Sequence, residues 1–293
     1  SGGSGPKDRW SPPDSIEALY EEANSLGGLN RPTAGARSQA EAPVGKASFQ
    51  LYSLATPNGQ KVGILLEELG LEYDAHVIRI GPGQLQQFTS GFVKINPNSK
   101  IPAAVDYAPT DGGDPVRLFE SGSILCYLAD KHSRFMPKTA RGRAACLNWL
   151  MWQLSGQGPM TGNFGHFMVY APGDKPDINR YGVARYGMEV QRLASTLNNH
   201  LADNRFICGD EYTIADMACL PWFQLLRATG YSHPNGVQAS SFLNMQQYTH
   251  LNRWADSLMS RRQVQRGMLV CRKYSKPWLV DKRFTHLGTM SKL

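Results

Sequence analysis

The chain has 293 residues, of which 41% are hydrophobic, and its formal net charge is +7. This composition is sufficient for one large globular core or two ordinary ones, and no apolar stretch approaches the roughly 20 residues that a membrane-spanning helix needs. The charge is uneven, because residues 261–293 hold nine Lys or Arg and one Asp, a balance of +8 that leaves −1 for residues 1–260. This basic segment lacks repeated Arg-Gly or stacked aromatic residues, which favours a solvated extension over nucleic-acid binding.

The cysteines and histidines show no pattern of a disulfide framework or a metal site. Five cysteines are an odd number, and none has the C-x-x-C spacing. The seven histidines are scattered, without ligand spacing to each other or to the cysteines. We therefore expect reduced thiols, a reducing compartment and no metal.

The first segment of the chain is an expected arm. Residues 1–46 are rich in Gly, Pro, Ser and Ala, and only residues 14–23 have the pattern of a short acidic helix. Because such a composition cannot bury much apolar surface, we expect an extended arm.

A strand, a polar turn and a helix follow the arm. Residues 49–54 are an apolar run, and after the turn apolar side chains recur at helical spacing as far as Gly70. Thr56 and Asn58 lie in the turn, where their side chains and free backbone N–H groups meet at the positive end of the helix. The turn alone favours ordinary helix capping over a site for an anion or thiolate.

The pattern then continues as a small mixed domain over residues 47–137. It predicts strands and helices in the order β-α-β-α-β-β-α, which is that of a thioredoxin-like fold. After the first strand and helix, the expected elements are a strand at 72–80, a helical piece at 86–92, a hairpin of 103–107 with 116–119, and a helix at 121–132.

Pro102 stands directly before a strand that should be internal. A cis bond between Ile101 and Pro102 would offer the Ile101 backbone to a ligand, and an extended peptide-like molecule could pair with it. A plain proline at the start of a strand is equally compatible with the sequence.

The pattern predicts an all-α second domain over residues 138–266. The expected fold class is therefore α+β, in which the strands lie in the first domain and the second domain is helical. Thr213 and Asp216 have the spacing of a capping box, a structural role. Phe164, His166 and Tyr170 lie between the first two helices and either line a substrate pocket or belong to the core. The helices are expected at residues 141–160, 178–201, 214–229 and 248–260.

Four motifs in this order resemble the glutathione transferase superfamily, and more narrowly its nu-class disulfide-bond reductases and the fungal nitrogen-regulator branch. The resemblance extends from about residue 29 to about residue 266, and residues 267–293 are an unmatched extension. The motifs begin at Thr56 (TPNGQK), Asn96 (NPNSKIPA), Phe119 (FESGSI) and Gly209 (GDEYTIADM).

The resemblance implies a glutathione transferase fold and a set of residues around the γ-glutamyl and cysteinyl parts of glutathione. Glu120 would face the ammonium group, and Ser121, at a helix N-terminus, would face the carboxylate. Ile101 would pair with the cysteinyl backbone. Thr56 and Asn58 would donate hydrogen bonds to the thiolate and so lower its pKa.

The resemblance also implies contacts at the far end of the tripeptide and to a second one. Lys100 and Gln87 would approach the glycyl end. Nu-class proteins hold two glutathione molecules or one glutathione disulfide, and Asn30 and Arg180 match positions that reach the second molecule.

The expected activity is glutathione-dependent disulfide reduction without an enzyme cysteine. A transferase that conjugates small electrophiles or reduces organic peroxides would start from the same thiolate. A non-catalytic binding or regulatory module is the alternative of another class, although it would not need Thr56, Asn58, Asn30 and Arg180 together.

Partners and location complete the expectations. The resemblance implies a homodimer, with glutathione, glutathione disulfide or a polyamine-linked bis-glutathione as ligand. The last tripeptide, Ser291-Lys292-Leu293, matches the signal that a peroxisomal import receptor reads at a free C-terminus, which predicts a peroxisome or glycosome, with the cytoplasm as the alternative.

Overall fold

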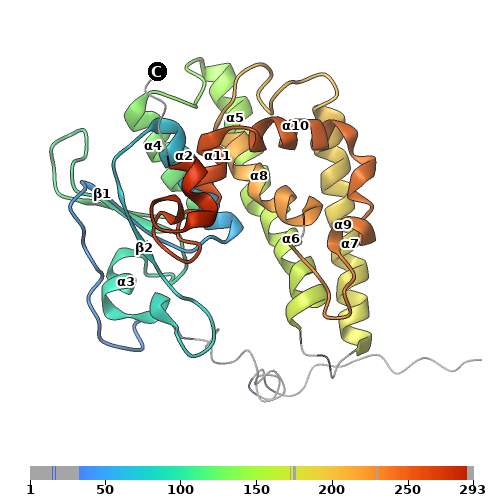
Figure 1. Cartoon of the computed structure of the whole chain (residues 1–293), viewed down its shortest axis with the longest axis horizontal. Coiled ribbons are helices and arrows are strands. Elements are labelled where there is room, and N and C mark those ends of the chain that lie inside the picture. The colour runs from blue at the N-terminus through green and yellow to red at the C-terminus, as the bar shows by residue number, and fades with distance from the viewer. Residues whose placement is uncertain are drawn as a thin grey trace, which may run out of the picture.

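The structure is a computed structural model that describes residues 33–171, 173, 176–228 and 230–288, together with Ser15 and Glu17. A sheet with its helices lies on one side of the molecule and a group of longer helices on the other (Figure 1). Asn30, most of the expected acidic helix at 14–23 and the terminal tripeptide fall outside the described residues.

The sheet has four strands in the order β2-β1-β3-β4. β2 is parallel to β1, whereas β3 is antiparallel to both β1 and β4. This topology confirms the expected thioredoxin-like domain, although β2 is shorter than the predicted strand at 72–80. The strands are β1 (Phe49–Ser53), β2 (Asp74–Val77), β3 (Ala103–Asp106) and β4 (Val116–Phe119).

Alternation along β1 explains the layers around the sheet. Leu51 points into the large core, which also holds buried side chains of α2 and α4, while Tyr52 joins a smaller core with α3. Helices therefore cover both faces of the sheet. Their bounds are α2 (Pro57–Leu69), η1 (Gln86–Phe88), α3 (Ser90–Ile95) and α4 (Ser121–His132).

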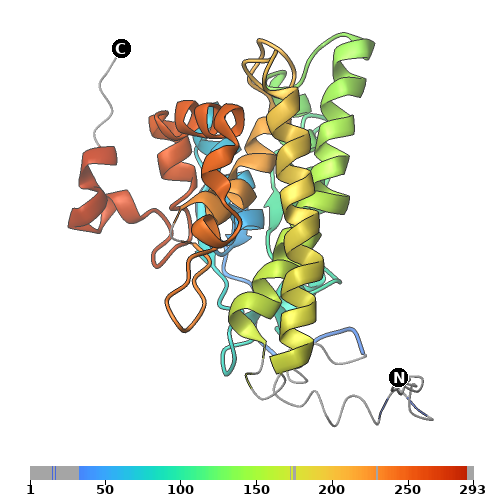
Figure 2. The ribbon, with the colours of Figure 1, turned by 90° about the vertical axis from the view of Figure 1, so that its right-hand side faces the viewer.

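The second domain is helical, as predicted, but its first helix is longer than expected. Residues 140–170 are helical throughout, with π-helical turns at η2 and η3, and α7 lies alongside this segment (Figure 2). The elements are α5 (Ala140–Trp152), η2 (Gln153–Gln157), α6 (Gly158–Gly165), η3 (His166–Tyr170), α7 (Pro176–His200), α8 (Ile214–Arg227), α9 (Ala239–Phe242), η4 (Met245–Gln247) and α10 (Thr249–Met259).

Helix α8 is the centre of this domain, and the predicted capping box begins it. The Thr213 side chain accepts a hydrogen bond from the helix backbone, and Asp216 accepts one from the Thr213 N–H at 2.9 Å. Asp216 also accepts bonds from the Ile207 N–H (2.8 Å) and from Nε1 of Trp254 (2.9 Å). Burial raises the pKa of Asp216, and these donors satisfy its oxygens.

The expectation of a solvated basic extension is wrong for residues 267–288. Helix α11 (Arg262–Gly267) lies against α2, where a Cβ on Gly267 would meet the Cα of Ile64 at 2.3 Å, so only glycine permits this approach. Gln60 of α2 donates to the Met268 carbonyl at 3.0 Å. The short helices η5 (Pro277–Leu279) and η6 (Lys282–Leu287) follow, and Trp278 is buried. The apolar anchors are too irregularly spaced to give a periodic signal.

All five cysteines lie in the described ranges as free thiols. Of the helices described, none combines the length and the apolar character that crossing a membrane requires.

Candidate functional site

A small polar hollow of about 200 Å³, here called the site hollow, lies where the N-termini of α2 and α4 meet the loop before β3. Both helices direct the positive ends of their dipoles toward it. Except for Asn96, every residue of its lining was a candidate from the sequence. The lining consists of Asn58, Asn96, Lys100, Ile101, Pro102, Glu120 and Ser121.

Thr56 acts as a helix cap, as the simplest interpretation of the turn predicted. Its Oγ1 accepts a hydrogen bond from the Gly59 N–H at 3.4 Å. Thr56 is half-buried, lies two residues before Asn58 in the chain and is not among the residues that line the hollow. Because the hydroxyl oxygen accepts the capping bond, its proton is still available to a ligand.

Asn58 is oriented by the second domain. Its Oδ1 accepts a hydrogen bond from Nε1 of Trp222 on α8, at 3.3 Å. An indole nitrogen can only donate, so the amide oxygen must face Trp222 and the amide N–H groups are left as donors. Trp222 is a site residue that the sequence did not reveal, because it lies 164 positions away in the other domain.

The loop before β3 is held by Asn96. Its Nδ2 donates to the Lys100 carbonyl at 2.6 Å, and its Oδ1 accepts from the Asn98 N–H at 2.9 Å. The bond between Ile101 and Pro102 is cis, which was one of the two alternatives for this proline. The sequence offered one signal for Asn96, its place at the start of a turn-forming Asn-Pro-Asn motif.

At the start of α4, Glu120 adopts a φ of 65°, a left-handed conformation that non-glycine residues seldom adopt. Such conformations cluster at functional sites. Ser121 is 4% exposed, and its Oγ accepts a hydrogen bond from Nζ of Lys61 at 3.2 Å. Lys61 is 1% exposed, and its burial lowers its pKa to about 7. No role for this lysine was expected from the sequence, because a single cation beside an apolar stripe is ordinarily at the surface.

Two predicted glutathione contacts do not lie in the site hollow. Gln87 is 6% exposed, and its Oε1 has no hydrogen-bond partner among the described residues. Arg180, on α7, lines a second hollow of about 730 Å³ with Phe167, His233 and Phe242. Asn30 is outside the described residues, so its predicted role is untested.

Of the three aromatic-segment residues for which the sequence left a pocket or the core open, Phe164 lies in the core, and none lines the second hollow. Phe164 is fully buried and packs against Phe242, so it belongs to the core. His166 and Tyr170 are not among the residues that line the second hollow, whereas their neighbour Phe167 is. These residues form the π-helical turn η3.

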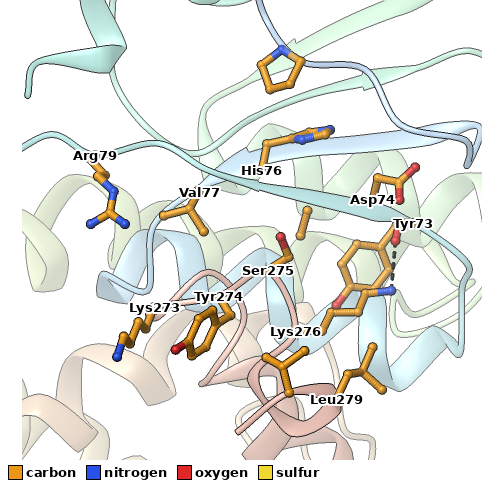
Figure 3. A pocket seen from close by; sticks show the side chains of 13 residues that line it. Tyr73, Asp74, His76, Val77, Arg79, Lys273, Tyr274, Ser275, Lys276 and Leu279 are labelled. Carbon is orange, nitrogen blue, oxygen red and sulfur yellow. Dashed lines mark hydrogen bonds between the residues drawn. The ribbon is translucent and has the colours of Figure 1, made fainter.

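A larger groove of about 820 Å³, here called the β2 groove, lies between β2 and residues 273–280 (Figure 3). Its Asp74 accepts hydrogen bonds from the Ala47 N–H (2.7 Å) and from Nε2 of Gln50 (3.1 Å). Its Lys276 donates to the Tyr73 carbonyl at 2.9 Å. These internal bonds occupy its acidic and partly buried groups, and no predicted site residue lies in it.

Metal ions need a set of several ligand side chains around one point. In the described ranges, no group of three or more His, Cys, Asp or Glu side chains is placed to hold an ion.

Comparisons with known protein families match both parts of the chain. Residues 55–131 match the family described as "Glutathione S-transferase, N-terminal domain". Residues 181–257 match "Glutathione S-transferase, C-terminal domain".

Individual relatives extend these matches over most of the chain. The disulfide-bond oxidoreductase YghU of Escherichia coli (strain K12) is 47% identical over 83% of this chain and 82% of its own length. A glutathione transferase YghU from Streptococcus pneumoniae, solved in complex with glutathione, is 41% identical with a TM-score of 0.79, covering 90% of this chain and 99% of its own. A glutathione transferase from Burkholderia graminis, with two glutathione molecules bound per subunit, is 38% identical with a TM-score of 0.71, covering 78% of this chain and 90% of its own.

Proposed function

Because this chain belongs to the glutathione transferase family, we propose that it reduces disulfides with glutathione and that the site hollow holds the glutathione. The observation that carries the proposal is that one hollow is lined by Asn58, Ile101, Glu120 and Ser121. The chain is also 47% identical to a disulfide-bond oxidoreductase. The protein is an enzyme that uses glutathione as co-substrate.

The hollow suits the γ-glutamyl end of glutathione. The Glu120 carboxylate complements the ammonium group, and the Ser121 hydroxyl at the start of α4 complements the carboxylate. The Ile101 backbone pairs with the cysteinyl unit, which directs the sulfur toward Thr56 and Asn58. Hydrogen bonds and the α2 dipole at that point stabilise the thiolate over the thiol.

The reaction is two successive thiol–disulfide exchanges. The bound thiolate attacks one sulfur of the substrate disulfide, so a mixed disulfide with glutathione forms and the other sulfur leaves as a thiolate that takes up a proton. A second glutathione thiolate attacks the glutathione sulfur of the mixed disulfide and releases the second thiol with glutathione disulfide. Two glutathione molecules are oxidised and one disulfide is reduced, so no enzyme cysteine is consumed.

Arg180 and Asn30 are proposed to hold the second glutathione. Support comes from the cationic side chain that Arg180 contributes to the second hollow and from the Burkholderia relative with two glutathione molecules per subunit. Arg180→Ala should raise the glutathione concentration at half-saturation on the order of tenfold, because a charge-assisted bond to a carboxylate is lost. An unchanged half-saturation would remove Arg180 from the second site. A polyamine-linked bis-glutathione would fill both positions with one molecule.

The activity is tested by comparing two reactions of the purified protein. We expect faster turnover of 2-hydroxyethyl disulfide with glutathione than conjugation of chlorodinitrobenzene. Dominant conjugation without disulfide turnover would show a conjugating transferase instead, and glutathione binding without either turnover would show a non-catalytic module.

The homodimer belongs to the proposal as well. Apolar side chains that are exposed in the single chain, such as Phe119 at the sheet and Met151 and Met188 in the helical domain, support a partner subunit that packs its second domain against the first domain of this chain. Sedimentation at the monomer mass of 32.4 kDa, at micromolar concentration, would refute it.

For location, we propose import into a peroxisome or glycosome by a receptor that reads Ser291-Lys292-Leu293 as a free C-terminus. The support is the sequence alone. A fluorescent fusion at the N-terminus should give punctate signal that disappears when the tripeptide is deleted. Diffuse signal from the intact chain would refute the proposal, as would punctate signal after the deletion.

A further inference from the structure

Lys61 is a buried lysine whose charge has no counter-ion in the described structure. It lies on α2, one helical turn after Asn58, and is 1% exposed. Its Nζ donates a hydrogen bond to Ser121 Oγ at 3.2 Å. In the described part of the chain, no carboxylate forms an ion pair with it, whereas fully buried lysines are ordinarily paired.

The groups around Lys61 do not neutralise it. The titratable groups that face it are Glu120, beside Ser121 on α4, and the thiol of Cys219 on α8. Glu120 is exposed, and burial holds the pKa of Cys219 well above its usual range, so that thiol is neutral. Burial correspondingly lowers the pKa of Lys61 to about 7. Below about pH 7 the ligand-free protein therefore holds a buried ammonium group that forms no ion pair among the described residues.

The hydrogen bond to Ser121 fixes the direction of the serine hydroxyl. A lysine ammonium can only donate, so Ser121 Oγ accepts from Lys61. The Ser121 proton is then free to point into the site hollow, which Ser121 lines. An anion bound there would receive the serine proton and would lie close to the buried charge.

We propose that Lys61 is the buried counter-charge of the γ-glutamyl carboxylate of glutathione and acts on it through Ser121. This inference rests on the proposed function, because it takes glutathione as the ligand of the site hollow. Lys61 is a positioning residue, since Ser121 and not Lys61 lines the hollow.

A dependence on pH follows from this arrangement. A bound carboxylate stabilises the ammonium form, so binding raises the pKa of Lys61. Above about pH 7 the free protein has lost part of the Lys61 proton, and binding must take it up again. Affinity should therefore fall as pH rises above this value, and below it the proton uptake should vanish.

The test is titration calorimetry of the full chain with S-methylglutathione, whose blocked thiol removes sulfur ionisation from the proton balance. Measurements in two buffers of different ionisation enthalpy give the number of protons taken up. We expect uptake approaching one proton near about pH 8 and close to none near about pH 6, with affinity falling by at most about tenfold per pH unit.

Lys61→Met keeps the length of the side chain and removes the charge. We expect an affinity loss on the order of tenfold at about pH 6 and no proton uptake at any pH. Lys276→Met is the matched control, because Lys276 is another partly buried lysine but lies in the β2 groove, so it should change neither quantity. Circular dichroism and thermal unfolding verify that each variant is folded.

A double-mutant cycle tests the route through Ser121. If Lys61 acts through this hydroxyl, Lys61→Met should cost much less affinity in a Ser121→Ala background than in the wild type. Full additivity would contradict the route, and Ser121→Ala itself should fold because its side chain is small.

The outcomes separate this inference from the proposed function. The inference alone would be overturned if the wild type turns over disulfide and binds S-methylglutathione, and Lys61→Met matches it in affinity and proton uptake. Wild-type protein that neither binds the ligand nor turns over would overturn both. If Lys61→Met does not fold, wild-type binding without proton uptake near about pH 8 is by itself the contradicting result.

Discussion

The β2 groove is larger than the site hollow, but its charged groups are internally bonded or exposed to solvent. The groove, at about 820 Å³, is four times larger than the hollow at about 200 Å³. Its charged groups are either occupied by internal hydrogen bonds, as Asp74 and Lys276 are, or exposed at the surface, as Arg79 and Lys273 are. The smaller hollow instead lies at two helix N-termini and is backed by a buried lysine.

If the site hollow holds the glutathione, as proposed, the larger volume of the β2 groove does not locate the chemistry. A charge in water is screened and interacts weakly with a ligand, whereas a buried charge or an oriented dipole keeps its strength. The site hollow is lined by Ser121, whose hydroxyl accepts a hydrogen bond from the buried Lys61. The predictions below probe this contrast, beginning with the largest effect.

Removing the thiolate donors should have the largest effect on turnover. Asn58→Ala and Thr56→Ala should each lower kcat/KM for 2-hydroxyethyl disulfide by about 5- to 150-fold, since each lost donor costs about 1–3 kcal/mol. Thr56→Ala should also lose about 1 kcal/mol of stability, because its side chain caps α2. If both folded variants keep full activity, the turn is a helix cap and nothing more.

Lys61 should make stability depend on pH. Its folded-state pKa of about 7 lies below the unfolded value, so from about pH 7 upward the unfolded chain binds more protons and stability rises with pH. Urea unfolding from about pH 7 to about pH 9 should show the wild type gaining on the order of 2 kcal/mol relative to Lys61→Met. Parallel stability curves for the two proteins would contradict this.

Trp222→Phe should have a smaller effect than Asn58→Ala. It removes the N–H that orients the Asn58 amide but leaves the amide itself, so we expect a cost of about 1 kcal/mol, a several-fold fall in kcat/KM. The half-saturating concentration of S-methylglutathione should change less, because the γ-glutamyl contacts are intact. A loss as large as that of Asn58→Ala would mean that Trp222 has a further role.

Substitutions in the β2 groove should have the smallest effect. Arg79→Ala with Lys273→Ala removes two exposed cations there, and exposed substitutions usually change stability by within about 0.5 kcal/mol. Disulfide turnover and glutathione saturation should stay within about twofold of the wild type. A marked fall in either would place the groove in the reaction and reverse the contrast.

The sequence predicted which strands and helices exist better than it predicted the residues at which they begin and end. Alternation and helical spacing identified all four strands, α2 and α4, because burial of one face is written directly into the pattern. The strand expected at residues 72–80 is only Asp74–Val77, and residues 163–170 are helical although a junction was expected. Strand ends depend on pairing with a neighbour and π turns on tertiary contacts, and neither leaves a periodic signal.

The sequence by itself determined the family, the order of elements and the local motifs. Thr56, Asn58, Glu120 and Ser121 all lie at the starts of α2 and α4, and helix starts are encoded by a few adjacent residues. Only the tertiary structure decided which distant groups support them. Trp222 reaches Asn58 from the other domain, and Lys61 reaches Ser121 across 60 positions. These contacts depend on how α2 packs against α4 and α8, and side-chain distances set by packing cannot be read from spacing along one chain.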